Sequence, residues 1–287
     1  VTLYERRTEH LGDRAPKVNG NRLARACMYH VRAAQIVLAS GAHERPLVYA
    51  KNDVPGNLLA GAVSTYIRRY GVVPGKRLVV STCHDDGYRA ALDWAEAGHE
   101  VVAIVDGRER ADGHWSEMAR AQGLNIIMGS AVIEAKGKNR VTGARIASID
   151  VARFQTTGVA SELSCDTIAS SGGYSPVVHL SSHTNARPAW REDLLGFVPA
   201  ELPGLTPVGG ACGVYALADV LKGGAEAGAE AAIGCGDTSA AIDLPDVERL
   251  ETGEALGLYQ VPHEKPSLRA PKQFVDLQND VTAAAIE

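Results

Sequence analysis

The sequence lacks several features that would point directly to a known chemistry. Its five cysteines are widely separated and form no Cys-x-x-Cys pair; they are Cys27, Cys83, Cys165, Cys212 and Cys235. An odd number of scattered cysteines favours a reducing compartment and gives no support for an iron–sulfur or cysteine-bound zinc site. No apolar run reaches the length of a membrane span, and the opening residues do not have the pattern of a signal peptide.

Positive charge is also in short supply. The net charge is -5 over 287 residues, which argues against nucleic acid or an anionic membrane as the natural partner. We therefore expect a cytoplasmic protein that binds neither. With 45% hydrophobic residues, the chain can bury one large core or two smaller ones.

The Gly-x-Gly-x-x-Gly cradle of dinucleotide-binding folds is absent from the whole sequence. What the chain has instead is three turns of small residues. The first turn follows residues 36–39, whose unbroken hydrophobicity predicts a strand buried on both faces. The second follows a similar apolar segment that starts at residue 167, and the third precedes a helical run at 215–227. Because parallel strand ends converge on one edge of a sheet, we expect the turns to line one nucleotide cleft.

The candidate cofactor-binding residues come from these turns, with one arginine beside the first. They are Ser40, Gly41, Ala42, Arg45, Gly172, Gly173, Gly209, Gly210 and Gly213. The glycines would let a ligand approach the backbone closely. Arg45 has two interpretations: a fork of donors for a phosphate, or a solvated loop residue that pairs with Glu44.

A strand–helix–strand unit lies in the middle of the sequence, at 77–81, 87–97 and 100–106. Its turn carries Asp85 and Asp86 where a phosphate cradle needs glycines and a free helix N-terminus. We expect these carboxylates to cap the helix and to repel a pyrophosphate. Asp106 resembles a ribose-binding acid, although an acid at a strand end is common. The unit is therefore predicted to be a degenerate dinucleotide lobe that binds no ligand.

Further elements are predicted as a helix at 58–70, a helix at 115–122 and a hairpin formed by 131–136 and 141–149. His179 and His183 could place two imidazoles on one helix face, but no third ligand follows, so packing is the favoured interpretation. No residue has the pattern of a catalytic acid or base. No metal site is predicted.

Three motifs carry a resemblance to a known family. They are Gly-Ala-His-Glu-Arg-Pro-Leu-Val at 41–48, Ser-Gly-Gly-Tyr-Ser-Pro-Val-Val-His at 171–179 and Phe-Val-Asp-Leu-Gln-Asn-Asp-Val-Thr at 274–282. Together they resemble the alpha subunit of heterotetrameric sarcosine oxidase. The same type of subunit occurs in methylglutamate dehydrogenase and dye-linked proline dehydrogenase.

The resemblance implies an α/β fold: a Rossmann-like, two-lobe dinucleotide-binding fold of the FAD/NAD(P)-binding, disulfide-reductase type, with a three-layer second lobe inserted in the first. The expected division is 1–73 with 167–243 as the first lobe, 74–166 as the inserted degenerate lobe, and 244–287 as a linker. In the family, the glycine cradle lies upstream and a folate domain lies downstream. A chain that opens on Val1 is therefore expected to be an internal fragment of a longer subunit.

The resemblance also implies partners and cofactors. NAD would bind in this subunit, FMN at a subunit interface, FAD on a partner subunit, and tetrahydrofolate on the C-terminal domain. The partners would be beta, gamma and delta subunits, and the substrate a small amino acid. The expected reaction is oxidative demethylation of sarcosine to glycine, with formation of hydrogen peroxide and methylene-tetrahydrofolate. The resemblance favours the phosphate-binding interpretation of Arg45.

Two other functions stay open. One is a stand-alone NAD(P)H-dependent flavin reductase, which the missing cysteine pair disfavours. The other is a scaffold that binds no nucleotide. Flavoproteins of this fold carry Gly-Asp for ribitol before the last helix, whereas this chain has Gly210 in that position. This difference argues against FAD bound by the chain itself.

Overall fold

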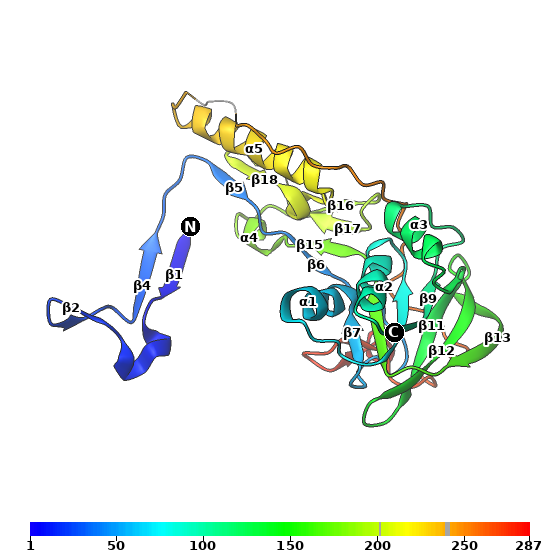
Figure 1. The fold of residues 1–287 in the computed structure, drawn as a ribbon. Coiled ribbons are helices and arrows are strands. Elements are labelled where there is room, and N and C mark those ends of the chain that lie inside the picture. Colours follow the sequence, from blue (N-terminus) through cyan, green and yellow to red (C-terminus); the bar gives the residue numbers. More distant parts are fainter. Residues whose placement is uncertain (201, 239–241) are drawn as a thin grey trace.

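A five-stranded parallel sheet forms the centre of the computed structural model (Figure 1). The order of its strands is β10 (Ile126–Ile127), β9 (Glu100–Asp106), β8 (Arg77–Thr82), β14 (Thr167–Ser171) and β7 (Asn57–Leu59). The structure describes residues 1–200, 202–238 and 242–287. Positions 201 and 239–241, which belong to the predicted first lobe, lie outside the described residues.

Three helices cover one face of this sheet, and an antiparallel sheet covers the other. The helices are α1 (Ala60–Tyr70), α2 (Asp86–Glu96) and α3 (His114–Ala121), and the antiparallel strands are β11 (Ser130–Gly137), β12 (Val141–Asp150) and β13 (Gln155–Leu163). Alternation along β8 explains both contacts: Leu78 and Val80 pack with the helices, whereas Val79 packs with the antiparallel sheet. The result is the three-layer arrangement that was predicted.

Residues 36–44, together with elements between 174 and 234, form a separate set of small sheets. β5 (Ile36–Leu38) pairs in parallel with β18 (Leu205–Pro207), and β6 (Ala42–Glu44) pairs with β15 (Tyr174–Pro176). Other elements near them are α4 (His179–Ser182), β16 (Ala189–Arg191), β17 (Gly196–Val198), the 3-10 helix η2 (Gly209–Cys212) and α5 (Leu217–Gly234).

β5 corrects one prediction. Its unbroken hydrophobicity predicted a strand buried on both faces, yet Val37 is 38% exposed and only Leu38 is fully buried. The physical reason is that β5 lies in a small two-stranded sheet with β18, where α5 packs on one face. The other face stays accessible to solvent at Val37.

The first thirty residues form an arm that stands apart from the rest of the chain in Figure 1. β1 (Thr2–Arg6) pairs with β4 (Ala26–His30), with η1 (Glu9–Arg14), β2 (Lys17–Val18) and β3 (Asn21–Arg22) between them. Every residue of β1 is exposed.

The segment 244–287 was predicted as a linker and contains little regular structure: β19 (Phe274–Asp276), β20 (Val281–Thr282) and α6 (Ala283–Ile286). It is nevertheless packed against the protein. Leu258 and Val261 are 3% and 1% exposed and belong to the core beside the antiparallel sheet. The burial of these apolar side chains distinguishes this segment from a free linker.

The central sheet also reaches beyond the range 74–166 predicted for the inserted lobe, because β7 and β14 hydrogen-bond within it. The predicted boundary at residue 74 lies in the loop between α1 and β8, two elements of the same layered body. We keep the division 1–73 with 167–243, 74–166 and 244–287 as a proposal. Within the described residues, no helix is both long and apolar enough to cross a membrane.

Replacing Trp94 by alanine should strongly destabilise the protein. Trp94 is fully buried among the helices, and its indole nitrogen donates to the Glu100 carbonyl at 3.1 Å. Loss of the ring leaves a cavity and an unpaired carbonyl, which lowers the free energy of unfolding by about 3–5 kcal/mol. Urea denaturation followed by circular dichroism measures the change. Trp190→Ala, at a side chain 46% exposed, is the matched control; equal losses in the two variants would contradict the burial of Trp94.

Candidate functional site

Two of the predicted turns meet at an edge lined by main chain. β5 and β18 are parallel neighbours, so the turn at Gly41 and the turn at Gly209–Cys212 leave the same end of the pair. A Cβ atom on Gly210 would lie 3.3 Å from the Ala42 nitrogen and 3.4 Å from the Gly41 Cα. Gly41 has a φ of +72° and open space beside it. This edge therefore combines close backbone contact with room for a ligand at Gly41.

The turn at Gly172 and Gly173 lies at the opposite end of β6 and β15. The Val177 nitrogen donates to the Gly41 carbonyl at 2.9 Å, whereas the Arg45 nitrogen donates to the Gly173 carbonyl at 2.8 Å. The pair β6–β15 thus connects the first and second turns, and the pair β5–β18 connects the first and third. The structure places the second turn beside Arg45, however, and not beside Gly41.

Several of the predicted residues pack against the protein. Ser40 donates its hydroxyl to the Val177 carbonyl at 3.0 Å. A Cβ atom on Gly209 would lie 3.4 Å from Val220, and one on Gly213 would overlap the Leu194 side chain. Gly209 and Gly213 also have φ values of +60° and +83°, which only glycine adopts without strain. Packing and backbone conformation therefore explain why positions 209 and 213 are glycine.

Arg45 binds the protein through most of its donors. Its Nε donates to the Gly172 carbonyl at 3.2 Å, and its Nη1 donates to the Leu195 carbonyl at 2.6 Å and the Tyr259 hydroxyl at 3.1 Å. The guanidinium carbon also lies 4.5 Å from the centre of the Tyr259 ring. In the described part of the chain, Nη2 is the nitrogen left for a ligand. The phosphate-binding role of Arg45 stays a prediction, and its hydrogen bonds tie the second turn to Tyr259.

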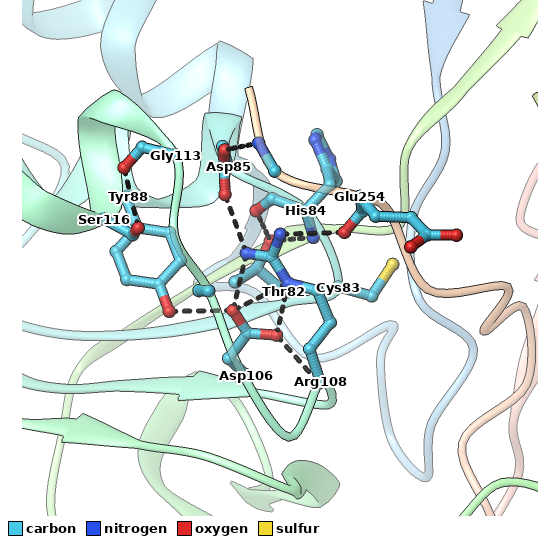
Figure 2. A network of polar contacts seen from close by, with 12 residues as sticks. Thr82, Cys83, His84, Asp85, Tyr88, Asp106, Arg108, Gly113, Ser116 and Glu254 are labelled. Atoms are coloured by element: carbon cyan, nitrogen blue, oxygen red, sulfur yellow. Dashed lines mark hydrogen bonds and ion pairs between the residues drawn. The ribbon is translucent and has the colours of Figure 1, made fainter. Parts of the chain in front are cut away.

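In the second lobe, the buried side chain of Arg108 lies between Asp106, at the end of β9, and Asp85, in the turn after β8 (Figure 2). The Arg108 Nη2 atom lies 2.8 Å from Asp106 Oδ2 and 2.9 Å from Asp85 Oδ1. These three side chains are 6%, 0% and 4% exposed, respectively. Tyr88 donates its hydroxyl to Asp106 at 2.7 Å, and burial together with this carboxylate raises the pKa of Tyr88. Both carboxylate oxygens of Asp106 therefore accept hydrogen bonds from the protein itself. A ribose-binding acid would need a free oxygen for the sugar hydroxyls.

The two aspartates of the turn do not cap α2, which corrects the prediction. Asp85 already has helical φ and ψ of -72° and -26°, so its side chain does not reach back to the first amides of the helix. Its Oδ2 instead accepts a hydrogen bond from the Gly253 nitrogen at 2.6 Å. Asp86 accepts from the Tyr174 hydroxyl at 2.7 Å. Both carboxylates hold other segments of the chain.

A chain of three polar side chains crosses the junction between β6, β14 and the turn after β8. Ser171 donates its hydroxyl to Glu44 Oε1 at 2.6 Å, and its oxygen lies 2.7 Å from His84 Nε2. Glu44 Oε2 accepts from the Gly61 nitrogen at 2.9 Å, which caps the N-terminus of α1. Burial lowers the pKa of His84 and raises the pKa of Glu44. The negative charge of Asp86 partly offsets the lowering of the His84 pKa and adds to the raising of the Glu44 pKa.

Sequence reasoning did not select these three residues. Glu44 was assigned to a solvated loop or to a pair with Arg45, and Ser171 was quoted only as part of a motif. One signal was present in the sequence: Ser171 is the last residue of β14 and His84 lies two residues beyond β8, and both strands have apolar residues at their centres. Polar side chains in that position gather at the carboxyl edge of a parallel sheet.

The two histidines considered as metal ligands lie on a helix of one turn. His179 begins α4, and His183 is its C-terminal cap. Within the described residues, no group of three or more His, Cys, Asp or Glu side chains could hold a metal ion.

The sequence is similar along its whole length to sarcosine oxidase alpha subunits. It is 33% identical over 289 residues to that of Corynebacterium sp. strain P-1, and 35% identical over 261 residues, 88% of this chain, to that of Rhizobium meliloti strain 1021. The resemblance drawn from the three motifs is therefore confirmed. The chain spans 29% of the length of the first relative and 24% of the second. No family model matches the sequence.

Solved structures of thioredoxin reductases share the fold. The Lactococcus lactis enzyme superposes with a TM-score of 0.55 at 19% identity, covering 73% of this chain and 67% of that one. The T. acidophilum enzyme gives 0.54 at 17% identity, covering 72% and 66%. The predicted fold class, a two-lobe dinucleotide-binding fold of the disulfide-reductase type, is confirmed.

His84→Gln should flatten the pH dependence of stability. Because the pKa of buried His84 is lowered from 6.5, the side chain is neutral in the folded state and takes up a proton on unfolding. The free energy of unfolding should therefore fall as the pH drops below about 6.5, by at most ~1.4 kcal/mol per pH unit for this one proton. Glutamine keeps a donor for Ser171 but does not titrate.

Urea denaturation at a series of pH values from 7.5 to 5 tests this expectation. Glu44, with its raised pKa, contributes stability that is present below about 4.5 and is lost as the pH rises through its folded value. The contribution of Glu44 to the pH dependence of the free energy of unfolding is therefore opposite in sign to that of His84. It is present in both the unmodified protein and the His84→Gln variant. His10→Gln, at an exposed position, is the control. An unchanged slope in the His84 variant would refute a neutral, buried His84.

Proposed function

We propose that this chain, similar over its whole length to sarcosine oxidase alpha subunits, forms the NAD-binding part of an alpha-type subunit in a multi-subunit, flavin-dependent amine oxidase. The reaction of the whole protein would be oxidative demethylation of sarcosine to glycine, with hydrogen peroxide and methylene-tetrahydrofolate as further products. A related amino-acid dehydrogenase acting on methylglutamate or proline is the second candidate within the same type of subunit.

The observation that carries the proposal is the contact between the first and third turns. Gly41 and Ala42 lie against Gly210 so closely that any side chain at Gly210 would press on their backbone. Such an edge presents amide groups without side chains, which suits the phosphates and sugars of a dinucleotide. The residues present thus fit one wall of an NAD site, made of Ser40–Ala42 and Gly209–Gly210. When bound, NAD supplies a group that can accept or donate hydride.

The cysteines favour this proposal over a stand-alone flavin reductase. All five are unpaired. Burial raises the pKa of Cys83 and of Cys165 to about 12, so both stay protonated thiols at neutral pH. A protonated, buried thiol is a poor electron acceptor or nucleophile. This chain therefore offers no dithiol for electron transfer, and the redox chemistry belongs to flavins.

The remaining assignments extend the same proposal. FMN would lie at a subunit interface, FAD on a partner subunit, and tetrahydrofolate on a C-terminal domain outside this sequence. The companions would be beta, gamma and delta subunits, and the amino-acid substrate would bind away from this chain. The isolated chain would act as a nucleotide-binding scaffold.

Gly210→Ala should weaken NAD binding by roughly tenfold, or about 1.4 kcal/mol. The added methyl group would lie 3.3–3.4 Å from the backbone of Gly41 and Ala42 and push the two turns apart. Isothermal titration of the purified chain with NAD measures the affinity. Gly228→Ala, where the new Cβ meets nothing within 4 Å, is the matched control. Equal affinity in both variants would count against this edge as the NAD site.

The purified chain alone should produce no hydrogen peroxide from sarcosine. Hydride removal from an amine requires a flavin, and the sequence has neither a glycine cradle nor a Gly-Asp contact to hold FAD. A peroxidase-coupled assay with added FAD, FMN and NAD measures the product. Addition of the companion subunits should restore it. Reduction of an added redox dye with methylglutamate or proline in place of sarcosine detects the related dehydrogenases, which need not form peroxide. Peroxide from the isolated chain would overturn the proposal.

A further inference from the structure

One short segment of the C-terminal part lies across the strand ends of the second lobe. We call residues 251–259 the strap. The Glu251 carbonyl accepts a hydrogen bond from the His114 nitrogen at 2.9 Å, which fixes the strap to the start of α3. The Leu256 nitrogen donates to the Cys83 carbonyl at 2.9 Å, directly after β8. The strap therefore spans from one helix start to the neighbouring strand end.

The middle of the strap meets the buried ions (Figure 2). The Gly253 nitrogen donates to Asp85 Oδ2 at 2.6 Å, and Arg108 Nη1 donates to the Glu254 carbonyl at 3.1 Å. The strap backbone thus supplies one donor to a buried carboxylate and one acceptor to a buried guanidinium. Both contacts satisfy charges that would otherwise need water or a ligand.

Apolar contacts add to these hydrogen bonds. A Cβ atom on Gly107, the residue after β9, would lie 3.2 Å from a methyl group of Leu256 and 3.4 Å from one of Leu258. Leu258 is 3% exposed. The absence of a side chain at Gly107 lets the strap approach the strand end as closely as a bound ligand would.

The strap lies at the edge of the sheet where this type of fold usually binds its ligand. The chain runs from β8 outward to β9 and β10 and then returns to β14 on the other side of β8, so the strand order reverses between β8 and β14. Open α/β sheets bind their ligands outside the carboxyl ends of the strands at this point. The strap contacts the carboxyl end of β8 and the residues that follow β9.

We propose that the strap is a built-in peptide ligand: it occupies the nucleotide-binding edge of the second lobe and excludes a dinucleotide from it. Asp85 acts through the strap, since its Oδ2 accepts a hydrogen bond from the Gly253 nitrogen. The strap also reaches the first lobe, where Tyr259 accepts a hydrogen bond from Arg45 at 3.1 Å. This inference is independent of the proposed oxidase function and of NAD binding at Gly41 and Gly210.

Hydrogen exchange measured by mass spectrometry on the whole 287-residue chain tests the proposal. Within 251–258, the amides of Gly253, Leu256 and Leu258 donate hydrogen bonds; in the unmodified protein they should be protected and should stay protected when NAD is added at millimolar concentration. Leu256→Asp places a carboxylate against the apolar cluster on which Leu256 packs, and should speed exchange of these amides about tenfold while β8 and β9 stay protected. Leu268→Asp, at a leucine 79% exposed on the same segment, is the matched control and should change nothing there.

A second variant covers the case in which Leu256→Asp does not fold. Gly253→Pro removes the backbone N–H that binds Asp85 Oδ2 and should also release the strap. Three results would overturn the proposal: rapid exchange of these amides in the unmodified protein, faster exchange on addition of NAD, or unchanged protection in a folded variant. The NAD affinity of the Gly210→Ala variant, measured by isothermal titration, tests the proposed site in the first lobe separately.

Discussion

The buried guanidinium of Arg108 is the interaction on which much of the second lobe depends. A cation that is 6% exposed needs compensating partners, because an unpaired buried charge costs several kcal/mol. Its partners come from the end of β9, the start of α2 and the segment after residue 250. One side chain therefore fixes the relative positions of a strand, a helix and a distant loop. Tyr88 completes the arrangement by satisfying Asp106.

The layered fold was largely predictable from the sequence because its signals are local. The strands β8 and β9 each contain an apolar run, and the amphipathic helix α2 lies between them in the sequence. The hairpin of β11 and β12 has a glycine, Gly137, at its turn. β13 was missed because it is polar and mostly exposed, so it has no apolar alternation. The burial of β5 was overestimated because hydrophobicity does not reveal whether one or both faces of a strand are covered.

The candidate site was predictable only in its backbone. Small residues after apolar segments correctly indicated turns, and the structure brings Gly41 and Gly210 together. The partners of the charged side chains could not be predicted, since Asp85 and Gly253 are 168 positions apart, and Arg45 and Tyr259 are 214 apart. Pairings at such distances depend on the tertiary fold. For this reason, local reasoning did not find Gly253 as a partner of Asp85 or Tyr259 as a partner of Arg45.

The distance along the chain between the second lobe and the strap also has a consequence for biosynthesis. The last strand of the sheet ends at Ser171 and the strap contact is at Gly253, so 253 - 171 = 82 residues separate them. At about 5–20 residues per second, the ribosome needs roughly 4–16 s to make this stretch. During that interval the sheet can form while its charged edge is still hydrated. The nascent lobe is thus complete in its strands, but open at one edge, before its last contacts are translated.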